Sequence, residues 1–256
     1  AVFFGKANEI TGFVNSQYDK VDDYFHLKEE NQRIHKMNDS LLNLLQTNFI
    51  KADTGSHIIT DTIRYDTLGT VRKYLAKEAK VVSNSINSQK NYFQINRGSG
   101  QGIKDNMAVI NSDGSVVGQV VGVSENFSQV MSLLNVHSIV SAMMKKSRNT
   151  GRIEWDGQSP LYLTLRNIPK SDSVVKGDTV LTGINTFNYP PGWIIGTIED
   201  FVEDKSTNFY VLRVRPAANF QNLQQVFVIE NLQREEQVEL DKTTQKKVDE
   251  LNKRKQ

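Results

Sequence analysis

The 256-residue chain contains no cysteine, which excludes disulfide bonds, thiolate metal sites and a cysteine nucleophile. It has only five prolines, and no apolar run approaches the roughly 20 residues of a membrane-spanning helix. Neither sign of charge dominates, because 31 Lys and Arg residues stand against 29 Asp and Glu residues. The resulting net charge of +2 gives no reason to expect nucleic acid as a partner.

Patterns of catalytic and metal-binding residues are also missing. The chain has four histidines, none in a zinc motif such as His-Glu-x-x-His: His26, His35, His57 and His137. A chymotrypsin-like hydrolase would need converging Ser, His and Asp side chains, but only His137 lies in the β-rich region and no serine has a Gly-Asp-Ser-Gly setting. We therefore expect no catalytic residue, no metal site and no cofactor.

Three glycines, Gly98, Gly100 and Gly102, follow an apolar segment and resemble a phosphate-binding loop. Such a loop must lead into a helix, whose amino-terminal end receives the phosphate. Here the next residues form two apolar runs around a turn at Asp113 and Gly114, which is typical of a β-hairpin. The pattern indicates a glycine-rich connection between strands and not a nucleotide site.

Residues 1–50 have a helical composition and a seven-residue repeat. The repeat places seven residues at the seam of a coiled coil: Tyr24, Leu27, Asn31, Ile34, Asn38, Leu41 and Leu45. Asparagine at a buried position fixes the register of a two-stranded coil, so we expect a parallel homodimer. The alternative is a single amphipathic helix packed on its own domain.

From Tyr74 onward the hydrophobic period changes from helical to two, which is typical of strands. A first series of strands is expected at 79–82, 92–96, 116–123, 130–134 and 139–143. A second series is expected at 161–165, 179–181, 193–198, 209–214 and 225–229. We assign most aromatic side chains of these strands, Phe209 and Tyr210 included, to core packing.

These short, regularly spaced strands predict a mainly β fold, with one long amino-terminal helix and two small antiparallel barrels. Residues 51–73 are polar and are expected to form a linker. We expect the first barrel at 74–148 and the second at 149–231, with the break near 145–156. Residues 232–256 are rich in Gln, Glu and Lys, which predicts a solvated, disordered tail.

Four groups of residues in the β-rich region resemble, in order, the signature of the rod-shape-determining protein MreC family. They are Asn96–Ser99 with Gly102 and Gly118, Gly177–Gly183, Tyr189–Gly192 with Gly196, and Arg215–Phe220. Ten motif positions are expected to be structural: Gly98, Gly102, Gly118, Gly177, Asp178, Gly183, Pro190, Gly192, Gly196 and Pro216. The chain departs from the family pattern at Asn96, where an acidic residue is usual, and between Thr182 and Gly183, where a serine is common.

The resemblance implies a bacterial inner-membrane protein on the periplasmic side, held by a single amino-terminal anchor. Because the chain begins at Ala1 without an initiator Met, we expect that anchor to precede it. The family's barrels are similar to chymotrypsin-like proteases that have lost their catalytic residues. The resemblance also implies a non-enzymatic scaffold of cell elongation, which binds and activates the elongation-specific penicillin-binding transpeptidase and works with MreD, RodA and MreB. Members can self-associate beyond the dimer into filaments.

Two other classes of protein share this composition. One is a trypsin-like periplasmic hydrolase or its inactive relative, which would need a nucleophile. The other is a coiled-coil and β-barrel adaptor of an efflux or secretion system. Such adaptors usually insert a helical hairpin between two β halves, whereas this sequence predicts one amino-terminal helix.

Overall fold

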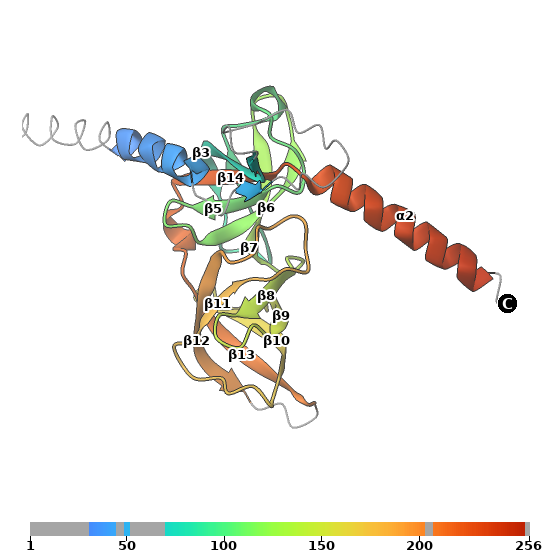
Figure 1. Ribbon diagram of the computed structural model, residues 1–256. Coiled ribbons are helices and arrows are strands. Elements are labelled where there is room, and N and C mark those ends of the chain that lie inside the picture. Colours follow the sequence, from blue (N-terminus) through green and yellow to red (C-terminus); the bar gives the residue numbers. More distant parts are fainter. Residues whose placement is uncertain (1–30, 45–48, 52–69, 203–206, 254–256) are drawn as a thin grey trace, which may run out of the picture. The chain divides into compact units, whose positions relative to one another are not determined.

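The computed structural model describes residues 31–44, 49–51, 70–202 and 207–253 (Figure 1). It divides into two compact units, Ala1–Leu42 and Asn43–Gln256. Of the predicted amino-terminal helix, residues 31–44 are described and are helical. Three predicted seam residues, Tyr24, Leu27 and Leu45, lie outside the described residues.

The helix predicted over 1–50 does not reach its predicted end, because residues 49–51 are a strand. β1 (Phe49–Lys51) pairs antiparallel with β2 (Thr70–Arg72), so both ends of the predicted linker are strands. The rest of that linker, residues 52–69, lies outside the described residues.

The first barrel is closed by six antiparallel strands in the spatial order β14-β3-β4-β7-β6-β5. Their bounds are β3 (Tyr74–Asn84), β4 (Lys90–Ile95), β5 (Ala108–Asn111), β6 (Val116–Val123), β7 (Ser128–Asn135) and β14 (Gln225–Asn231). β14 comes from far along the chain and lies between β3 and β5, pairing Val226 with Ala79 and with Asn111. Without β14 this barrel would have two open edges.

The second barrel is also closed and six-stranded, in the order β10-β13-β12-β11-β8-β9. Its strands are β8 (Val140–Met144), β9 (Thr150–Glu154), β10 (Leu163–Pro169), β11 (Thr179–Thr182), β12 (Ile194–Val202) and β13 (Phe209–Pro216). The whole barrel is therefore an insertion between β7 and β14 of the first barrel, as the coloured chain shows in Figure 1.

This insertion corrects the predicted domain boundaries. The prediction of two barrels in sequence, at 74–148 and 149–231, is wrong because β14 belongs to the first barrel. The break expected near 145–156 is also wrong, since β8 and β9 pair as a hairpin of the second barrel. The chain enters the second barrel between Asn135 and Val140 and returns to the first between Pro216 and Gln225.

Alternation of inward and outward side chains explains why these segments form barrels. In β10, for example, Leu163 and Leu165 are fully buried while Thr164 between them is partly exposed. The interior of the first barrel includes Phe93 and Phe227, and that of the second includes Leu165 and Ile195, all less than 2% exposed. Burial of such side chains contributes about 1.5–3 kcal/mol each.

Most of the predicted tail is helical, which corrects a second prediction. α2 (Arg234–Lys253) has no buried residue, so it is not held by an apolar face packed on the barrels. Its Glu, Lys, Gln and Leu residues have high helix propensity, and Glu235 and Glu236 complement the positive amino-terminal end of the helix dipole. None of the described helices is long and apolar enough to cross a membrane.

Candidate interaction surfaces

Asp178, a motif residue, is a buried carboxylate that joins two turns of the second barrel. It accepts a hydrogen bond of 2.9 Å from the Val175 N–H group and forms an ion pair with Lys146, in the β8–β9 turn. Burial opposes ionisation, but the hydrogen bonds from Lys146 and Val175 outweigh it and lower the pKa of Asp178. Asp178 therefore has a structural partner and no free reactive role.

Pro190 and its neighbours form a loop folded around the buried side chain of Thr182. The Thr182 hydroxyl group donates to the Pro190 carbonyl oxygen at 2.6 Å and accepts from the Trp193 N–H group at 2.9 Å. Gly192, two residues beyond Pro190, has φ +93°, a conformation that favours glycine. The loop is thereby fixed against β11.

Gly118 and Gly196 lie where two strands approach too closely for any side chain. A Cβ atom at Gly118 would collide with the Met131 carbonyl oxygen of β7, and one at Gly196 with the Arg215 carbonyl oxygen of β13. The other motif glycines lie in turns and connections: Gly98, Gly102, Gly177 and Gly183. Pro216 ends β13. The ten motif positions thus lie apart in both barrels and do not form one site.

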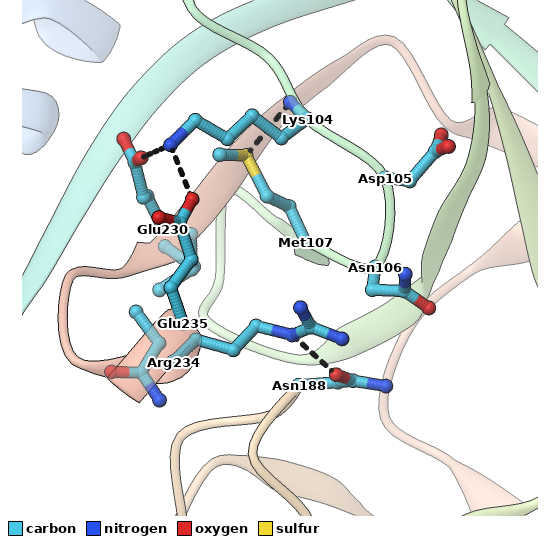
Figure 2. A pocket seen from close by; sticks show the side chains of 10 residues that line it. Lys104, Asp105, Asn106, Met107, Asn188, Glu230, Arg234 and Glu235 are labelled. Carbon is cyan, nitrogen blue, oxygen red and sulfur yellow. Dashed lines mark hydrogen bonds and ion pairs between the residues drawn. The ribbon is translucent and has the colours of Figure 1, made fainter. Parts of the chain in front are cut away.

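Figure 2 shows a small pocket at the junction of β14, α2 and the loop that contains Asn188. Lys104 Nζ lies 3.4 Å from a Glu230 oxygen and 3.1 Å from a Glu235 oxygen, and Arg234 Nε donates to Asn188 Oδ1 at 2.8 Å. The hydrogen bond that Lys104 donates to Glu235 is the main reason that the pKa of Lys104 is raised. Lys104, Glu230, Glu235, Arg234 and Asn188 thus pair within the pocket, and these contacts attach the start of α2 to both barrels.

The described residues contain no catalytic or metal-binding constellation. No group of three His, Cys, Asp or Glu residues there is placed to hold a metal ion. His137 is exposed, and in this part of the chain no hydrogen bond joins its ring to a serine or carboxylate.

An aromatic cluster of two rings lies at one end of the second barrel, formed by Phe201 of β12 and Tyr210 of β13, which face the same side of the sheet. Phe201 and Phe209 are each 45% exposed, and the rings of Phe201 and Tyr210 lie 6.2 Å apart. Assigning Phe209 to the core was therefore wrong. The strand alternation contained a signal: Leu212 and Val214 face inward, so Phe209 and Val211 face outward. Phe209 thus lies on the opposite side of the sheet from Phe201 and Tyr210. Partly exposed aromatic side chains are typical of protein-binding surfaces.

The described part of the amino-terminal helix exposes a row of apolar side chains. Ile34 and Leu41, both predicted for the seam, are 43% and 57% exposed. Met37 and Leu44, which the repeat did not select, are also exposed and continue the same face at three- and four-residue spacing. Two seam registers therefore compete, one containing Asn38 and the other Met37, and both contain Ile34 and Leu41.

Known proteins resemble this chain in sequence. The family model for rod shape-determining protein MreC, barrel core, matches residues 81–230. The cell shape-determining protein MreC of Listeria monocytogenes is 28% identical over 227 residues, covering 86% of this chain and 73% of that protein. The corresponding protein of Haemophilus influenzae is 28% identical over 155 residues, but the chain spans only 43% of its length.

Solved structures share the fold. A structure of MreC from Listeria monocytogenes matches 83% of this chain and 93% of that one, with a TM-score of 0.58 and 25% identity. MreC in a complex with penicillin-binding protein PBP2 from Helicobacter pylori matches 62% of this chain and 99% of that one, with a TM-score of 0.51 and 16% identity.

Two closed barrels, one inserted into the other, together with the family match, place the chain among the barrel-core proteins of cell-shape determination. The chain belongs to the MreC family of rod shape-determining proteins. This membership confirms the resemblance seen in the sequence.

Proposed function

We propose that this chain is a non-enzymatic scaffold on the periplasmic side of a bacterial inner membrane. In this role it binds and activates the elongation-specific penicillin-binding transpeptidase. It thereby links peptidoglycan synthesis to MreD, RodA and the MreB filament. Membership of the MreC family supports this role, and the PBP2 complex of the Helicobacter relative supports the choice of partner.

The observation that carries the proposal is the aromatic cluster of Phe201 and Tyr210. A cluster of half-exposed rings costs free energy in water and is suited to filling pockets on a partner protein. β12 supports this role, because its residues from Asp200 to Val202 pair only with β13 in the described residues. The cluster thus lies beside a strand edge, a second feature that proteins use for docking.

Dimerisation through the amino-terminal helix completes the proposed scaffold. The exposed row that contains Ile34 and Leu41 has the spacing of a coiled-coil seam and would be covered by a second helix. Dimers that associate further would form the filament implied by the family.

Interferometry of the purified chain against the periplasmic region of its own organism's elongation transpeptidase tests this role. We expect saturable binding, weakened about tenfold or more when Phe201 and Tyr210 are both replaced by Ser. Phe127→Ser is the matched control, because Phe127 is an exposed phenylalanine of the first barrel, 49% exposed. Absence of binding by the folded wild-type chain would overturn the proposed function, and an equal loss in the control would overturn the aromatic cluster as its site.

A further inference from the structure

The outer wall of the second barrel carries four arginines on three neighbouring strands. We call Arg152 of β9, Arg166 of β10, and Arg213 and Arg215 of β13 the arginine face. Strand pairing sets Arg166 opposite Arg152, and Thr164, two residues before Arg166, opposite Arg213. The inward residues between them are buried, so all four arginines point to solvent.

The arginine face is arranged by its own partners. Glu154 pairs with both Arg152 and Arg166, while Arg215 Nε donates to Glu199 at 3.0 Å. The Tyr162 ring lies 5.2 Å from the guanidinium carbon of Arg213 and 5.8 Å from that of Arg215. Stacking on an aromatic ring holds a guanidinium group flat and ready to bind a carboxylate through two hydrogen bonds.

The choice of arginine is itself informative. The chain has more Lys than Arg, yet these strands of the second barrel carry four Arg and no Lys. Arginine gives a planar fork that fits carboxylates and is more weakly hydrated than lysine, which suits contacts that exclude water. Arg213 has no ion pair within the described residues, so its fork is open to a partner.

The first half of α2 offers the opposite charge. Glu236, Glu239 and Asp241 are exposed, and no Lys or Arg lies between Glu235 and Asp241. Glu235 is held by Lys104, whereas the other three carboxylates have no ion pair within the described residues. Glu236, Glu239 and Leu240 share one face of the helix, and Leu240 is 67% exposed.

The spacing of the glutamates on α2 is similar to the spacing of the arginines on β13. Residues three apart on a helix have Cβ atoms about 5–6 Å apart, as for Glu236 and Glu239. Residues two apart on a strand are about 6–7 Å apart and point the same way, as for Arg213 and Arg215. Leu240 beside the two glutamates would meet apolar surface offered by Tyr162 and Val211 beside the arginines.

We propose that the acidic half of α2 of one copy docks on the arginine face of a second copy. The carboxylates of Glu154 and Glu199 disfavour a uniformly anionic polymer as the occupant, because they would repel its charges. Each copy carries both surfaces, so the contact is head-to-tail and extends into an open assembly of dimers. This inference rests on the self-assembly of the proposed function and names its contact.

The full chain is tested by sedimentation velocity at about 0.03 M and about 0.5 M salt, where exposed charges are weakly and strongly screened respectively. We expect species larger than the dimer at low salt, with an association constant at least about tenfold lower at high salt. One variant carries Arg213→Glu with Arg215→Glu, and the other carries Glu236→Lys with Glu239→Lys. Each alone should lose the large species, and a 1:1 mixture should restore them because each supplies the complement of the other.

A matched control, Lys80→Glu with Lys90→Glu, makes the same change in net charge at exposed positions of the first barrel and should leave association unchanged. Melting temperatures equal to that of the wild type show that the variants fold. If the variant with Arg213→Glu and Arg215→Glu does not fold, Arg213→Gln with Arg215→Gln takes its place. Absence of any species beyond the dimer in the wild type would overturn the proposed self-assembly and this inference with it. If both variants still assemble, or if mixing them does not restore assembly, the contact between α2 and the arginine face is overturned and the self-assembly is not. Transpeptidase binding by the wild type is measured separately.

Discussion

The Thr182 hydroxyl group donates a hydrogen bond to the carbonyl oxygen of Pro190 across 2.6 Å, in a fully buried setting. It also accepts from the Trp193 N–H group. Thr182→Val keeps the shape but leaves both backbone groups without a partner, so we expect a loss of about 2 kcal/mol in the free energy of unfolding. Urea denaturation measures this loss.

The control for Thr182 is Thr197→Val, the same change at an exposed position of β12. Its effect should stay within about 0.5 kcal/mol. Equal stability of the two variants would show that the Thr182 hydrogen bonds do not hold the loop.

Asp178 predicts a pH dependence of stability. Its pKa is lowered in the folded protein, so its ionised form stabilises the fold fully above the unfolded value of 3.8, and the stabilisation is lost as the pH falls towards the folded pKa. Asp178→Asn should therefore unfold at lower temperature than wild type at pH 7, with a smaller difference below about pH 3.8. Melting curves across this range measure the difference, and a gap that stays constant down to low pH would contradict the assignment.

Gly118 and Gly122 both lie in β6 and provide a matched pair. A methyl group at Gly118 would collide with the Met131 backbone, whereas one at Gly122 would lie 3.7 Å from the Gln129 side chain, an ordinary contact. We expect Gly118→Ala to destabilise the chain by about 3 kcal/mol or more and Gly122→Ala by less than about 1 kcal/mol. Chemical denaturation distinguishes them, and a tolerated Gly118→Ala would mean that β6 and β7 can separate.

The amino-terminal seam predicts the oligomeric state. Replacing Leu27 and Ile34 by Asp should give a monomer with intact barrels, because a charge on each helix would be buried at the seam. Sedimentation velocity reports the state and near-UV circular dichroism reports the barrels. Lys36→Asp, on the far side of the helix from Ile34, should leave the dimer unchanged. An unchanged sedimentation coefficient in the double variant would contradict the seam.

A second comparison identifies the register of that seam. If Asn38 lies in the seam, as the repeat predicts, Asn38→Leu strengthens the dimer and Met37→Ser has little effect. If the exposed row of the structure forms the seam, Met37→Ser weakens it. The dimer dissociation constants of the two variants decide between these registers.

The sequence by itself determined most of the local structure. Alternating apolar residues placed ten of the strands, since Leu163 and Leu165 could be buried only if Thr164 faced outward. The ordered family motifs also identified the family. Both follow from local rules, because residue type and a period of two need no knowledge of distant segments.

Only the tertiary structure decided how those strands close into barrels. Its place in the sequence predicts that β14 is the last strand of the second barrel, but it pairs with β3 and β5. In that position it removes the open edges of the first barrel. Charge composition made residues 232–256 look disordered, while α2 is helical. The arginine face was equally hidden: Arg152, Arg166, Arg213 and Arg215 are scattered in sequence, and antiparallel pairing alone brings them onto one wall.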